Sequence, residues 1–125
     1  MLGFPPSVRF FIATQPVDGR KGADSLIALV RNALSQDPFL GHLYVFFSKR
    51  CDRVRIVYWD RDGFALWSKK LQRGRFHTRF SDDATLHAQP IESGELNLIL
   101  EGIDLRGARR RARWEPHQTG PGGPN

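Results

Sequence analysis

The sequence predicts one α+β domain, residues 1–105, in which two helices pack on a mainly antiparallel sheet of four or five strands. The chain has 125 residues, 40% of them hydrophobic and 14 of them aromatic, which is enough for one modest core. Short runs rich in β-branched and aromatic residues follow one another closely, as in a meander of strands. Two other segments have apolar residues at helical spacing. Residues 106–125 are basic and then rich in Pro and Gly, and we expect them to be disordered.

The first strand and the first helix are expected near the beginning of the chain. Val8–Thr14 is apolar and β-branched, which is typical of a strand. A helix should then run from an N-cap at Asp24 or Ser25 to about Ser35, before Pro38 ends it. The apolar stripe of this helix comprises Leu26, Leu29, Val30, Ala33 and Leu34.

Several strands are expected in close succession after this helix. Leu43–Ser48 is almost wholly apolar, which favours a central strand buried on both faces. Arg53–Trp59 alternates between two faces, and Phe64–Leu71 should return beside it after a turn at Arg61-Asp62-Gly63. Phe76–Phe80 is a candidate for one more short strand.

A second helix is predicted close to the end of the domain. Ser93 is a suitable cap, and the helix should extend from about Gly94 to Ile103. Leu96, Ile99, Leu100 and Ile103 would form its apolar stripe, with Glu95 and Glu101 on the polar side.

The charge of the chain is strongly segregated along the sequence. The net charge is +6 and the pI is near 10.2. Residues 49–79 contain ten basic and three acidic residues, residues 80–105 contain six acidic and no basic ones, and residues 106–125 contain five basic and one acidic. Clustered Lys and Arg suit a polyanion, because they displace the counterions condensed on phosphates. The alternative is a sheet whose solvated face is simply rich in cations.

Catalytic and metal-binding patterns are weak, so we expect no enzyme, no metal and no cofactor. Asp60 and Asp62 flank a turn, where Asp is common for turn chemistry alone. The four histidines are scattered without ligand spacing. Cys51 is the single cysteine, which excludes an internal disulfide. Neighbouring arginines could lower the pKa of its thiol, but no specific base can be assigned to it.

The location expected from the sequence is the cytoplasm. No run of 18 apolar residues is present, so no membrane-spanning helix is predicted. The N-terminus shows neither a basic leader nor a long apolar stretch. A reduced compartment also agrees with a single cysteine.

The candidate DNA-binding residues gather on the central hairpin and on the turn before the first helix. The turn Asp18-Gly19-Arg20-Lys21-Gly22 either contacts phosphate or is a tight turn with exposed cations. Trp59 and Trp67 each lie four residues from Gly63 and could form a cross-strand pair, although at least one is expected in the core. The basic run Arg106–Arg113 would assist. The candidate residues are Arg20, Lys21, Lys49, Arg50, Arg53, Arg55, Lys69, Lys70, Arg73 and Arg75.

Five motifs in order resemble a known family. They are Asp18–Gly22 (DGRKG), Asp37–Phe46 (DPFLGHLYVF), Arg53–Asp60 (RVRIVYWD), Gly74–Phe76 (GRF) and Leu100–Asp104 (LEGID). Together they resemble the small accessory protein, the second open reading frame or TnpB, of bacterial insertion sequences of family sixty-six. The likeness covers roughly residues 5–105. Gly19 stands where the family usually has Met, and His77-Thr78-Arg79 stands where Trp-Pro often follows.

The resemblance implies a part in transposition beside a separate, larger transposase that holds the catalytic acidic residues. It transfers no site residues to this chain. The expected partners are DNA, as element ends or non-specific duplex, the element's transposase, and a second copy in the case of a homodimer; no membrane is expected. The alternative is a protein-interaction adaptor, in which the apolar strands and acidic residues 80–105 dock the transposase or another copy. A metal-dependent nuclease using Asp60 and Asp62 is a minor third hypothesis.

Overall fold

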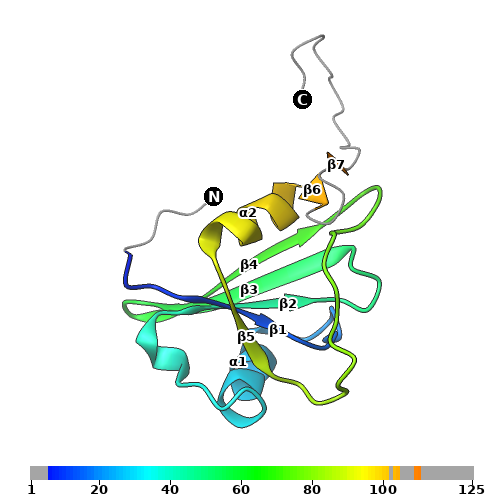
Figure 1. Ribbon diagram of the computed structural model, residues 1–125. Coiled ribbons are helices and arrows are strands. Elements are labelled where there is room, and N and C mark those ends of the chain that lie inside the picture. Colours follow the sequence, from blue (N-terminus) through cyan, green and yellow to red (C-terminus); the bar gives the residue numbers. More distant parts are fainter. Residues whose placement is uncertain (1–5, 102, 105–108, 111–125) are drawn as a thin grey trace.

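A five-stranded sheet with one helix on each face forms the body of the protein (Figure 1). The computed structural model describes residues 6–101, 103–104 and 109–110. The strand order is β4-β3-β2-β1-β5, which confirms the predicted α+β class. The strands are β1 (Phe10–Ala13), β2 (Leu43–Phe47), β3 (Arg53–Asp60), β4 (Gly63–Lys70) and β5 (Ala88–Ile91). The helices are α1 (Ala23–Asn32), the 3-10 turn η1 (Pro38–Leu40) and α2 (Ser93–Glu101).

The two helices cover opposite faces because the strands alternate. In β2, Tyr44 and Phe46 pack with α1, whereas Leu43, Val45 and Phe47 pack with α2. All five residues of β2 are buried, which confirms the predicted central strand. The α1 layer adds Leu26, Ile27, Val30 and Leu34, and the α2 layer adds Leu96, Ile99 and Leu100.

The first two strands of the sheet are parallel, and this decides where the loops lie. Phe10 pairs with Leu43 and Ile12 with Val45 in the same direction. Parallel neighbours need a crossover, which here contains α1. The segment after β1 therefore lies at the same end of the sheet as the segment after β2. The other pairings in this sheet are antiparallel.

The hairpin between β3 and β4 has a register different from the one predicted. Asp60 pairs with Gly63, so the turn consists of Arg61 and Asp62, with Arg61 at a positive φ of 56°. Trp59 consequently lies opposite Phe64, whereas Trp67 lies opposite Ile56 on the other face of the sheet. The predicted Trp59–Trp67 pair is wrong, because the hairpin is centred between Arg61 and Asp62 and not on Gly63.

Three further predictions about the elements need correction. Helix α1 begins at Ala23 with Gly22 as its N-cap and no side-chain cap, so Asp24 and Ser25 fall inside its first turn. Residues 76–80 form no strand, and the fifth strand is β5, whose edge position tolerates Pro90. Helix α2 ends before Ile103, which belongs instead to a separate two-stranded ladder.

This two-stranded ladder follows α2. It pairs β6 (Ile103–Asp104) with β7 (Arg109–Arg110). Residues 102, 105–108 and 111–125 lie outside the described residues, and with them most of the predicted tail and of the basic run 106–113.

Candidate nucleic-acid interface

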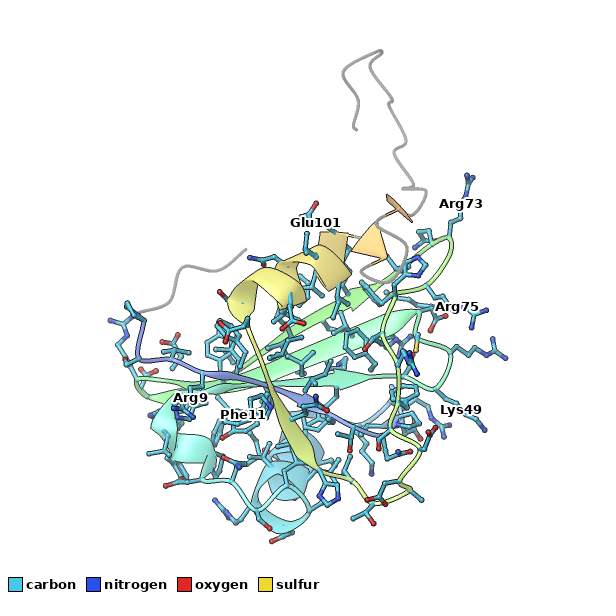
Figure 2. All side chains as sticks on the ribbon, viewed as in Figure 1. Arg9, Phe11, Lys49, Arg73, Arg75 and Glu101 are labelled. Atoms are coloured by element: carbon cyan, nitrogen blue, oxygen red, sulfur yellow. The ribbon has the colours of Figure 1, made fainter. Side chains whose placement is uncertain are left out.

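Three loops meet at one end of the sheet, which we call the basic end. They are residues 14–22 after β1, 48–52 after β2 and 71–76 after β4. Backbone hydrogen bonds join them: Val17 N–H donates to the Phe47 carbonyl at 3.0 Å, and Leu71 N–H donates to the Asp52 carbonyl at 2.8 Å. Lys49, Arg73 and Arg75 project from this end, away from Arg9 at the other end (Figure 2).

An open hollow of about 820 Å³ lies between the first two of these loops, the start of β3 and Lys70 at the end of β4. Its acidic residues are both engaged by neighbours. Asp18 accepts hydrogen bonds from Arg20, and Asp52 accepts one from the Ser48 hydroxyl at 3.1 Å. Five cations line the hollow, namely Arg20, Lys49, Arg50, Arg53 and Lys70. The chemistry of the hollow therefore favours an anion.

The carbonyl of Gly19 joins the turn after β1 to strand β3. It accepts a hydrogen bond from Arg53 Nη1 at 2.9 Å and another from Arg55 Nη1 at 2.6 Å. Both arginines are partly buried, and Arg55 Nε is buried without a hydrogen-bond partner in the described part of the chain. Two guanidinium groups are thus held side by side beneath the turn.

Glycine at position 19 permits this close approach. A Cβ built on Gly19 would lie 2.9 Å from Arg53 Cδ, so any other residue there would displace the Arg53 side chain. The absence of a side chain therefore lets the turn lie directly on Arg53.

The turn itself is closed by Asp18. The Arg20 backbone N–H donates to Oδ1 of Asp18 at 2.9 Å, and the Arg20 guanidinium forms an ion pair with Oδ2 at 3.0 Å. These hydrogen bonds, the side-chain one first, lower the pKa of Asp18 to about 2. The charge of Arg20 is accordingly compensated, and Lys49, Arg50, Arg53 and Lys70 supply the remaining positive field of the hollow.

The structure divides the ten candidate residues into two groups. Arg20, Lys49, Arg50, Arg53 and Lys70 line the hollow, and Arg55 adjoins it through Gly19. The other four lie outside the hollow. Lys69 pairs with Val54 and faces the α2 side, and Lys21 donates its backbone N–H to Asp18. Arg73 and Arg75 are exposed on the loop after β4.

Sequence reasoning missed the supporting groups of this site. Ser48 and Asp52 are absent from the candidate residues, although the Ser48 hydroxyl also accepts a hydrogen bond from the Arg53 N–H at 3.2 Å. A local signal does exist for Asp18, since Asp commonly accepts from the backbone N–H two residues later. No local signal connects Gly19 with Arg53 and Arg55, because 34 and 36 residues separate them.

Cys51 and the aspartates of the hairpin turn are the residues that the sequence offered as weak catalytic candidates. Burial raises the pKa of the Cys51 thiol and outweighs the lowering effect of Arg75, so the suggestion of a lowered pKa is wrong. Asp60 lies 3.9 Å from Arg61 in an exposed ion pair. Within the described ranges, no three His, Cys, Asp or Glu side chains gather as metal ligands. No helix in the same ranges is long and apolar enough to cross a membrane.

Comparisons with known proteins place the chain in a family. The family model described as "IS66 Orf2 like protein" matches residues 8–110. The uncharacterized protein y4jC of Sinorhizobium fredii is 41% identical over 93% of this chain and 97% of its own length. The uncharacterized protein y4hO of the same organism is 32% identical over 96% of this chain and 100% of its own length. No solved structure matches. The chain therefore belongs to the IS66 Orf2-like family, a group of insertion-sequence accessory proteins.

Proposed function

We propose that this protein is a non-catalytic accessory factor of transposition that binds DNA through the phosphates, using the hollow at its basic end. The observation that carries the proposal is the gathering of cations from two separate loops, the start of β3 and the end of β4 around one open hollow. Like charges repel, so such a cluster is most readily explained by a polyanion that neutralises it.

The arrangement favours binding to the DNA backbone over reading of the bases. Lys49, Arg50 and Lys70 are exposed side chains on a loop and at a strand end, where they reach phosphates without entering a groove. The lining of the hollow comes from loops and strand ends, whereas a recognition helix would present a row of side chains to a groove. Binding of this kind should be steeply dependent on salt and tolerant of sequence.

The proposal is tested by replacing two exposed cations of the hollow, Arg50→Ala together with Lys70→Ala. Binding of fluorescent duplex DNA is measured by anisotropy across a salt series, with element-end and scrambled duplexes in parallel. The slope of log K against log [salt] should flatten by about 0.9 for each phosphate that the variant no longer neutralises, hence by up to about 1.8. Both duplexes should be affected alike.

A matched control removes the same charge from the opposite end of the sheet. Arg9→Ala with Arg61→Asn lowers the net charge equally, and Asn tolerates the positive φ of position 61. This control should retain most of the wild-type slope. If both double variants flatten the slope equally, binding is not localised to the hollow. If the wild-type protein does not bind DNA at low salt, the adaptor function takes precedence, and light scattering and a transposase pull-down become the tests.

A further inference from the structure

An exposed aromatic ring lies at the opposite end of the β3–β4 hairpin from the hollow. Phe39, in η1, is 50% exposed. Its ring lies 5.1 Å from that of Trp59 and 5.3 Å from that of Phe64, between centroids, and the Trp59 and Phe64 rings are 5.0 Å apart. We call these three residues the aromatic cluster. Figure 1 shows η1 beside the turn between β3 and β4.

The aromatic cluster is held in place and is not a loose loop. The Asp37 carboxylate accepts a hydrogen bond from the Phe39 N–H at 2.9 Å, and Pro38 is buried. Gly41, at a φ of 83°, ends η1 in the left-handed region. The Arg31 guanidinium carbon lies over the Phe39 ring, 5.8 Å from its centroid, so a cation covers one face of the ring and the other is left for a base.

One open face of β4 connects the aromatic cluster to the hollow. Phe64, Leu66, Ser68 and Lys70 alternate onto the face that also carries Arg53 and Arg55. Leu66, Ser68 and Lys70 are exposed, so α1, whose core reaches Val57 and Phe64, leaves this part of the face uncovered. The strand from Phe64 to Lys70 spans about 20 Å. No acidic residue occurs in β4.

We infer that this face binds a single-stranded segment of DNA, with phosphates at the hollow and a base stacked on the aromatic cluster at Phe39. The inference rests on the proposed function and specifies the form of the nucleic acid. In a duplex the base faces are covered by their neighbours, whereas a single strand offers both π-faces and phosphates. An apolar protein partner would match Phe39 but not the cations that lie along the same strand pair.

The test compares two strands of equal length and charge, an oligothymidine and an abasic oligomer, by fluorescence anisotropy. The variant is Phe39→Leu, which keeps an apolar side chain and removes the ring. The control is Leu40→Ala, because Leu40 is adjacent, 62% exposed and aliphatic. Phe39→Leu should weaken oligothymidine binding by about 5-fold to 100-fold. It should leave binding of the abasic strand and of duplex DNA unchanged, and Leu40→Ala should change none of the three.

The outcomes separate this inference from the proposed function. If Phe39→Leu and Leu40→Ala weaken oligothymidine binding equally, the inference is overturned. The proposed function is still tested separately, by the duplex binding of the Arg50→Ala, Lys70→Ala variant. Equal affinity of the wild-type protein for the abasic strand and for oligothymidine also overturns it. A circular-dichroism melt of each variant shows whether a loss of binding reflects unfolding; if Phe39→Leu unfolds, Phe39→Tyr should restore both the fold and the binding.

Discussion

Arg53 and Arg55 donate to the same Gly19 carbonyl, and we predict that their effects on the free energy of unfolding are not additive. Replacing both should destabilise the protein by more than the sum of the two single replacements. Each donates to the same carbonyl oxygen, at 2.9 and 2.6 Å, so the two donor nitrogens lie within about 5.5 Å of each other, the sum of the two bond lengths. At that separation two unit charges repel by about 0.8 kcal/mol in water and about 3 kcal/mol at an effective dielectric constant of 20. Each hydrogen bond from a charged guanidinium group stabilises the folded protein by about 1.5–3 kcal/mol, which opposes the destabilising repulsion.

The free energies of unfolding of three variants follow from these terms. Arg53→Met or Arg55→Met alone removes one hydrogen bond but relieves the repulsion, so each single change should have a small net effect. The double variant removes both hydrogen bonds and relieves the same repulsion once. It should therefore be less stable than the sum of the single effects by about 1–3 kcal/mol.

Urea unfolding followed by tryptophan fluorescence measures this coupling. The titration is repeated at low and high salt, because screening should reduce the repulsion and hence the coupling. Lys49→Met combined with Lys69→Met serves as the control pair and should be additive, since Lys49 lines the hollow whereas Lys69 faces the α2 side of the sheet. A coupling of zero, or one in which the double variant is more stable than the sum, would refute the argument that Gly19 holds two repelling guanidinium groups together.

Three other properties are predicted. The Asp18 carboxyl should titrate near pH 2 by carbon NMR, and Arg20→Ala should return its pKa toward 3.8. Because the pKa is lower in the folded than in the unfolded protein, the ionised carboxylate stabilises the fold above about pH 4. This contribution is lost as the pH falls through 2. Phe76→Ala should lower the free energy of unfolding in urea by about 3–5 kcal/mol, because this side chain is 1% exposed; a decrease below about 1 kcal/mol would contradict its place in the core. Cys51 should react slowly with a thiol reagent in the native protein and quickly in urea, and Arg75→Ala should slow the native reaction further, since Arg75 lowers the pKa of the thiol.

The elements with a regular apolar pattern could be predicted from the sequence. The alternation of Arg53–Trp59 reflects the two faces of β3, with Val54 and Ile56 buried on the α2 side and Val57 on the α1 side. The continuous apolar run of β2 reflects burial on both faces. Strand β5 could not be found in this way, because Ala88–Ile91 contains a proline and no alternation, and its pairing with β1 alone makes it a strand. The hairpin register depended on which residue takes the positive φ, and this is Arg61 rather than the more permissive Gly63.

The clustering of cations was easier to predict than the way in which the fold brings them together. The sequence pointed to the basic residues between Lys49 and Arg79 and to the turn with Arg20 and Lys21, and five of the ten candidates line one hollow; their role in binding stays a prediction. What composition could not show is that the parallel pairing of β1 with β2 carries Arg20 and Gly19 over the beginning of β3. That contact depends on the crossover through α1, which is a property of the tertiary fold and leaves no local pattern.

The crowding of charge at the basic end is itself an argument about function. The segments that meet at this end are far apart in sequence, and acidic residues among them could have balanced the basic ones. The chain does contain an acidic segment, residues 80–105. Instead the two acids in the hollow are engaged by Arg20 and Ser48, while Lys49, Arg50 and Lys70 remain exposed around Arg53. A local conflict of this kind lowers stability without a ligand, and such conflicts are typical of binding sites. An anion that enters the hollow would relieve the repulsion between these cations. The relief of this repulsion adds to the favourable free energy of binding that anion.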